Sequence, residues 1–211
     1  MRRVTKLARA ARAPVLPLFT WPNLVTLTRV LGAPAFVFCC HRAAAVGAPA
    51  TRWGAALLFA AIVGSDVLDG WLARRLRCAS VVGRFLDHGA DIFFILFALG
   101  WFAAWGWVTW WLPAAIAWAF GLYAFDSWRR SGGAGRQRRL LGSRLGHVGG
   151  ILNYAAVGAA MAEPALDLAL MPRPLRQAAL AAVMGVAVVS GLERLVLLWF
   201  GRGLQGLSEK T

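Results

Sequence analysis

The chain has 211 residues, of which 59% are hydrophobic, and it contains 11 tryptophans. So much apolar sequence is typical of an all-α integral membrane protein and argues against a soluble domain. The formal net charge is +14, but the basic residues stand in short clusters between apolar runs. That pattern indicates membrane topology and contact with anionic lipids, and it argues against nucleic acid as a partner. The three cysteines have neither disulfide-framework nor metal-site spacing.

Six apolar stretches follow one another along the chain, each near the roughly 20 residues that a helix needs to cross a bilayer. We expect a basic N-terminal interfacial arm over residues 1–22, a membrane domain of six transmembrane helices over 23–202 and a cytoplasmic tail over 203–211. The predicted helices run from Leu24 to Cys40, Trp53 to Ala73, Phe85 to Trp105, Trp107 to Trp128, His147 to Ala162 and Leu175 to Phe200.

Basic residues fall unevenly on the two sides of these stretches. Most of the 23 lysines and arginines precede the first stretch, follow the last, or lie between the second and third or the fourth and fifth. Positive charge accumulates on the cytoplasmic side of membrane proteins. The sequence therefore predicts a multi-pass protein with both termini in the cytoplasm.

Four carboxylates gather where the second and third stretches meet. Asp66 and Asp69 are three residues apart, and Asp87 and Asp91 are four apart, so each pair lies on one helix face. Ionised carboxylates near a bilayer are costly without a shared partner, and a divalent cation takes such oxygens readily. A structural ion-pair cluster with neighbouring arginines and the permeation site of a cation transporter are the alternatives.

Residues suited to a phosphate ligand stand among these carboxylates. Gly70 and Gly83 leave room for close approach, and Ala73 is small. Arg74 offers a planar fork that matches phosphate oxygens. Together with a cation, this set favours a diphosphate ligand.

The segment from Asp66 to Asp91 resembles the signature of the CDP-alcohol phosphotransferases, also called class I CDP-alcohol phosphatidyltransferases. That signature reads D-x-x-D-G-x-x-A-R, a spacer, then G-x-x-x-D-x-x-x-D, and every fixed position is filled here. The stretch from Pro22 to Arg29 is similar to the P-N-x-x-T-x-x-R element that opens many bacterial members.

The resemblance implies an enzyme of phospholipid biosynthesis in the bacterial inner membrane. Such enzymes displace CMP from a CDP-linked lipid such as CDP-diacylglycerol by an acceptor hydroxyl, with Mg²⁺ or Mn²⁺, and often form homodimers. Asp66, Asp69 and Asp87 would be metal ligands, and Asp91 would be the general base and a further ligand. The implied contacts to the CDP moiety are Gly70, Ala73, Arg74, Gly83, Asn23, Thr26 and Arg29.

A resemblance to one subgroup of the family indicates the acceptor. Phosphatidylglycerophosphate synthases resemble this chain in length, opening element and topology, which favours glycerol 3-phosphate. Many of them carry a lysine-bearing G-K-x-K-T-like element before the fifth stretch, whereas residues 142–147 here contain no lysine. Arg138, Arg139 and Arg144 are predicted to hold a phosphorylated acceptor, or else only to set topology and touch lipid. Inositol phosphate, serine or another alcohol remain alternative acceptors. A catalytically silent membrane scaffold remains an alternative function.

Two charged positions lie outside the signature. Asp126 is expected to pair with Arg129 or Arg130, three and four residues further along the helix. Glu193 and Arg194 lie within the last apolar stretch, where charged residues are functional candidates.

Overall fold

The computed structural model describes residues 21–76, 81–131, 144–168 and 172–208, and all regular secondary structure within these ranges is α-helical. The prediction of an all-α fold is confirmed. The helices are α2 (Trp21–Val46), α3 (Pro49–Leu76), α4 (Val81–Ala104), α5 (Trp111–Ser131), α6 (Arg144–Leu166) and α7 (Arg173–Ser208). They correspond one to one with the six expected stretches. Helix α7 continues beyond residue 202, where the tail was expected to begin.

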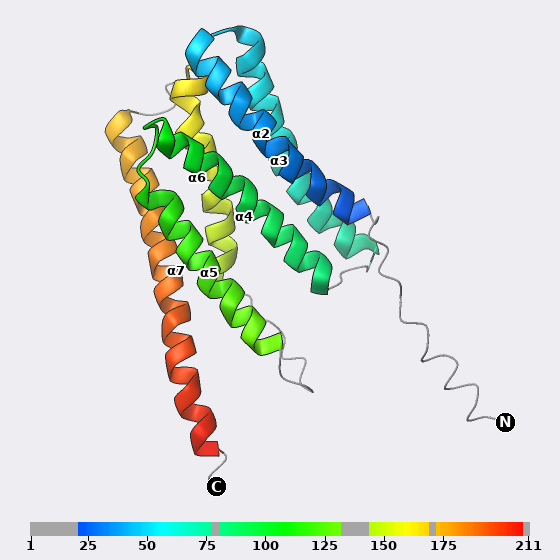
Figure 1. Ribbon diagram of the computed structural model, residues 1–211, viewed down its shortest axis with the longest axis vertical. Coiled ribbons are helices and arrows are strands. Elements are labelled where there is room, and N and C mark those ends of the chain that lie inside the picture. The colour runs from blue at the N-terminus through cyan, green and yellow to red at the C-terminus, as the bar shows by residue number, and fades with distance from the viewer. Residues whose placement is uncertain (1–20, 77–80, 132–143, 169–171, 209–211) are drawn as a thin grey trace, which may run out of the picture.

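The helices run alternately up and down (Figure 1). The α2–α3 turn, the end of α4 and the start of α7 lie at the upper end in that view. Toward the lower end lie the start of α2, the end of α3, the start of α4 and the end of α7. Both halves of the aspartate signature, at the end of α3 and the start of α4, are therefore at the same end as the start of α2.

Two glycines end helices at the upper end. Gly47 follows α2 with a φ of 69°, and its N–H donates to the carbonyl of Ala43 at 2.9 Å. Gly106 follows α4 with a φ of 75°, and the N–H of Trp107 donates to the carbonyl of Phe102 at 2.8 Å. A left-handed residue just past a helix is the usual C-terminal cap, and glycine adopts it without strain. The fourth helix was expected to begin at Trp107, directly after Gly106, whereas α5 begins at Trp111.

The core lies where α2 packs against α3, α4 and α6. The fully buried ring of Phe36 on α2 stands 5.3 Å from Phe94 and 6.1 Å from Phe102, both on α4. The same ring stacks at 5.9 Å on Phe59 of α3. Helix α7 packs mainly against α5 and also against α6, so it completes the other side of the bundle.

The outer surface of the bundle is strongly apolar. On α7 the exposed side chains include Val189 (55%), Val196 (52%) and Trp199 (76%). Soluble monomers rarely expose apolar faces of this extent. Two of the described segments, Thr28–Val46 and Arg173–Val196, are long and apolar enough to cross a membrane, whereas the apolar segment of α4, His88–Ala104, is shorter.

Candidate active site

The signature residues lie on two consecutive helices. Asp66, Asp69, Gly70, Ala73 and Arg74 belong to the last turns of α3, and Gly83, Asp87 and Asp91 to the first turns of α4. This backbone placement agrees with the prediction that the four carboxylates gather where the second and third apolar stretches meet. The side chain of Asp91 is within the described part of the chain, and the side chains of Asp66, Asp69, Ala73, Arg74 and Asp87 lie outside it.

Asp91 forms an ion pair with Arg29 of α2. The Nη1 atom of Arg29 donates to Oδ1 of Asp91 at 2.8 Å. The Arg29 side chain is completely buried, and the Asp91 side chain is 20% exposed. Arginine keeps its charge in any protein environment, so this contact stabilises the ionised form of the carboxylate.

Arg29 also binds the helix that carries the first half of the signature. Its Nε donates to Oγ of Ser65 at 3.2 Å, and the Ser65 hydroxyl in turn donates to the carbonyl of Ile62 at 2.7 Å. Ser65 directly precedes Asp66. One buried guanidinium thus connects α3 and α4 at the two halves of the signature, and the packing of α2 against both helices brings it there.

A tyrosine from a fourth helix reaches the same carboxylate. The hydroxyl of Tyr154 on α6 donates to Oδ1 of Asp91 at 2.8 Å. Its ring stacks on Phe94 with centroids 5.9 Å apart and an interplanar angle of 23°. Phe94 lies three residues after Asp91 on α4, so the helix that carries the carboxylate also supports the ring of its donor.

The sequence did not point to Tyr154 or Ser65. Tyr154 stands alone in a glycine-rich apolar stretch, without a motif around it. Ser65 borders the signature, and that neighbourhood is the signal that could have singled it out. Arg29 was expected beside the CDP moiety; its described contacts are with Ser65 and Asp91.

The remaining expected ligand contacts fall largely outside the described side chains. Asn23 and Thr26 belong to the first turns of α2, and Arg144 is the first residue of α6, but the side chains of all three lie outside the described part. Arg138 and Arg139 lie outside the described residues altogether. The backbone of α6 begins at the same end of the molecule as the signature (Figure 1).

A second polar cluster joins α5 and α7. Asp126 is buried, and its Oδ2 accepts from Nη1 of Arg194 at 3.4 Å. The Arg194 guanidinium carbon lies 5.4 Å from the ring centroid of Tyr123, which in turn is 6.3 Å from the ring of His88 on α4. Asp126 was expected to pair with Arg129 or Arg130, and Arg194 was not predicted as a partner. A rule based on helix spacing identifies contacts between residues three or four apart and not between residues 68 apart.

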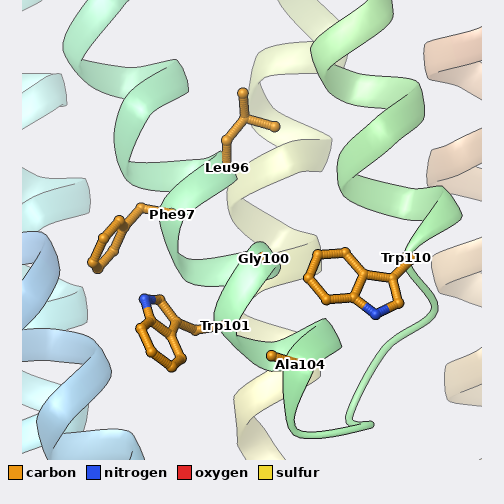
Figure 2. A pocket seen from close by; sticks show the side chains of 6 residues that line it. All are labelled: Leu96, Phe97, Gly100, Trp101, Ala104 and Trp110. Carbon is orange, nitrogen blue, oxygen red and sulfur yellow. The ribbon is translucent and has the colours of Figure 1, made fainter.

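An apolar hollow lies on α4 away from the signature. Leu96, Phe97, Gly100, Trp101, Ala104 and Trp110 line it (Figure 2). Figure 2 places Trp110 on one side of α4 and the rings of Phe97 and Trp101 on the other. Gly100 follows Asp91 by nine residues. That separation is about 13 Å along a helix, and the lining offers no titratable group, so this hollow has no part in the candidate chemistry.

The sequence profile of the CDP-alcohol phosphatidyltransferase family matches residues 19–199. The chain belongs to this family. The matched region covers all six helices except the end of α7, and it includes Arg29, Asp91 and Tyr154. Membership supports the predicted class of transferase, a CDP-linked alcohol as the type of substrate, and an association with the membrane.

Individual members of the family give shorter matches. A cardiolipin synthase (CMP-forming) of Streptomyces coelicolor is 42% identical over 81 residues, or 38% of this chain and 37% of that protein. A CDP-diacylglycerol–glycerol-3-phosphate 3-phosphatidyltransferase of Pseudomonas fluorescens is 37% identical over 37% of this chain and 38% of its own length. A putative cardiolipin synthase of Mycobacterium tuberculosis is 34% identical over 46% and 44%. The matched stretches span less than half of these relatives.

Proposed function

We propose that this protein is a multi-pass membrane enzyme that transfers a phosphatidyl group from CDP-diacylglycerol to an acceptor hydroxyl and releases CMP. The observation that carries the proposal is the buried Arg29, which binds Asp91, the last residue of a complete family signature, and Ser65, the residue just before that signature. A buried charge network at this point stabilises the relative placement of the two signature helices.

The same residues suit a divalent cation. Four carboxylates of the signature supply hard oxygen donors, which Mg²⁺ and Mn²⁺ prefer. Asp66, Asp69 and Asp87 would hold the ion, with Asp91 as a further ligand. When bound, the cation would neutralise diphosphate charge and improve CMP as a leaving group. Arg74 would add a bidentate contact to a phosphate oxygen.

Asp91 would act on the acceptor. The acceptor oxygen attacks the phosphorus that carries the diacylglycerol, and the bond from that phosphorus to the oxygen bridging it to CMP breaks. The hydroxyl proton passes to the Asp91 carboxylate, and CMP leaves with the electron pair of the broken bond. Arg29 favours the ionised carboxylate that such a base requires before the step.

The proposed orientation follows from the charges. The end of the bundle that carries the signature would face the cytoplasm, where water-soluble nucleotides and acceptors are present. The basic residues at and near the ends where α3 connects to α4 and α5 connects to α6 support that side as cytoplasmic. The apolar outer faces of α2 and α7 favour crossing by all six helices, with lipid around them.

Glycerol 3-phosphate is the first candidate acceptor, since the Pseudomonas relative is named for it. The name of the Streptomyces relative favours a second product, cardiolipin, whose acceptor would be the terminal glycerol hydroxyl of phosphatidylglycerol. The absence of lysine from residues 142–147 also fits a lipid acceptor, which needs fewer cations to capture it.

One experiment tests both candidates. Purified full-length protein in detergent receives CDP-diacylglycerol and Mn²⁺ or Mg²⁺ with glycerol 3-phosphate, phosphatidylglycerol, inositol 1-phosphate, serine or inositol. CMP release is measured, and the lipid product is identified by mass spectrometry. Phosphatidylglycerophosphate as product supports the first candidate, and cardiolipin supports the second. If no acceptor elicits CMP release, the proposed transferase activity is wrong.

A further inference from the structure

We propose that Tyr154 is a positioning residue that orients the carboxylate of Asp91 for proton transfer, an inference that rests on the proposed function. Tyr154 comes from α6, outside both sequence motifs. Its hydroxyl donates to Oδ1 of Asp91 at 2.8 Å, the oxygen that also accepts from Arg29.

Two donors from different helices fix the orientation of one carboxylate oxygen. Arg29 reaches Oδ1 from α2, and Tyr154 reaches it from α6. A single contact leaves a carboxylate free to rotate about χ2, whereas two donors on one oxygen define its plane. The direction of the second oxygen, Oδ2, is thereby set as well.

The tyrosine itself is held in place. Its ring stacks on the fully buried Phe94, which packs against the fully buried Phe36 of α2. A donor that is fixed by packing before the substrate binds needs no reorganisation during the reaction. Arg29 supplies the positive charge that stabilises the Asp91 carboxylate. The neutral hydroxyl of Tyr154 therefore contributes mainly to the orientation of that carboxylate.

The test compares the same chemical change at the two tyrosines of the chain. Tyr154→Phe removes the hydroxyl and keeps the stacked ring. Tyr123→Phe is the matched control, because no hydrogen bond from the Tyr123 hydroxyl is found in the part of the chain that the structure describes. Both variants and the wild type are purified, and CMP release from CDP-diacylglycerol is measured with the best acceptor.

Tyr154→Phe should lower kcat about 10- to 100-fold, the range expected for losing a hydrogen bond to a charged group. The KM for CDP-diacylglycerol should stay within about twofold, because ground-state binding does not use this contact. Mn²⁺ affinity, measured by electron paramagnetic resonance, should also stay within about twofold, since all four signature carboxylates are intact. The thermal midpoint should fall by no more than about 10 °C, the shift that losing one such hydrogen bond produces in a protein of this length. Tyr123→Phe should match the wild type in all four quantities.

The outcomes separate this inference from the proposed function. A wild-type protein without CMP release would overturn the function itself. An active wild type with equal kcat in both phenylalanine variants overturns the positioning role. A loss of kcat accompanied by lower Mn²⁺ affinity or a higher KM for CDP-diacylglycerol also overturns it, because Tyr154 would then support the site as a whole.

A second variant covers the case in which Tyr154→Phe does not accumulate as folded protein. Ser65→Ala removes the hydroxyl that Nε of Arg29 binds at 3.2 Å and loosens the other donor to Asp91. It should lower kcat about three- to tenfold with unchanged KM for CDP-diacylglycerol. Wild-type kcat in Ser65→Ala would show that turnover does not depend on how the two donors hold Asp91, and that result would overturn the proposal.

Discussion

Arg29 of α2 and Asp91 of α4 form an ion pair of 2.8 Å across 62 residues of sequence, and the arginine side chain is fully buried. Removing one partner of a buried pair leaves a charge without compensation, which typically costs about 3–5 kcal/mol. The pair therefore links the element that opens many family members to the aspartate signature.

Arg29→Gln should lower the thermal midpoint of the purified protein by on the order of 10 °C, because Asp91 loses its buried cation. Arg29→Lys keeps a charge but lacks the fork that reaches both Asp91 and Ser65, so its midpoint should fall less. If Arg29 served only as a nucleotide contact, Arg29→Gln would raise the KM for CDP-diacylglycerol and leave the midpoint unchanged.

Arg52 provides the matched control for this substitution. It pairs with Asp167 at 3.0 Å, but the two side chains are 35% and 74% exposed. Exposed pairs of this kind contribute at most about 1 kcal/mol. Arg52→Gln should therefore shift the midpoint by no more than about 3 °C.

The helices and the placement of the signature could be predicted from the sequence, whereas the network around Asp91 could not. Apolar runs of membrane length are a local signal, and they predicted α2 to α7 within a few residues at most boundaries. Tyr154 is brought to Asp91 by the packing of α6 against α2 and α4, which depends on many side chains at once. The same reason explains the pairing of Asp126 with Arg194.

Metal dependence gives a further prediction. A chelator should abolish CMP release, and added Mg²⁺ or Mn²⁺ should restore it, because the signature carboxylates would otherwise repel the diphosphate. Asp69→Asn should raise the Mn²⁺ concentration for half-maximal activity at least about tenfold. Asp167→Asn, an exposed carboxylate beyond the other end of α6, should leave that concentration unchanged. Full activity in excess chelator would contradict the cation role.

The acceptor can be tested at the start of α6. Arg144 opens this helix at the same end of the bundle as the signature. If it binds a phosphorylated acceptor, Arg144→Ala should raise the KM for glycerol 3-phosphate about 10- to 100-fold and leave the KM for CDP-diacylglycerol nearly unchanged. Arg42→Ala, in the last turns of α2 at the opposite end, is the control. If Arg144→Ala behaves like the control, the arginine only sets topology.

Gly191 on α7 and Trp118 on α5 give a test of the helix packing. A Cβ at Gly191 would lie 2.6 Å from Cε3 of the Trp118 ring, closer than real Cβ atoms approach. Trp118 is 40% exposed, so its ring can swing outward, at the cost of its contacts on α7. Gly191→Ala should therefore destabilise the protein by about 1–3 kcal/mol, seen as a lower thermal midpoint.

Gly185 on the same helix is the control for that substitution, because a Cβ there meets no atom within 4 Å. Alanine is the better helix former, so Gly185→Ala should stabilise the protein by roughly 0.5–1 kcal/mol. A second substitution, Trp118→Leu, should relieve the clash at Gly191 because it shortens the opposing side chain. Gly191→Ala should then cost less in the Trp118→Leu background than in the wild type, which a double-mutant cycle on the thermal midpoint measures. Equal costs in both backgrounds would show that α5 and α7 do not meet at these two residues.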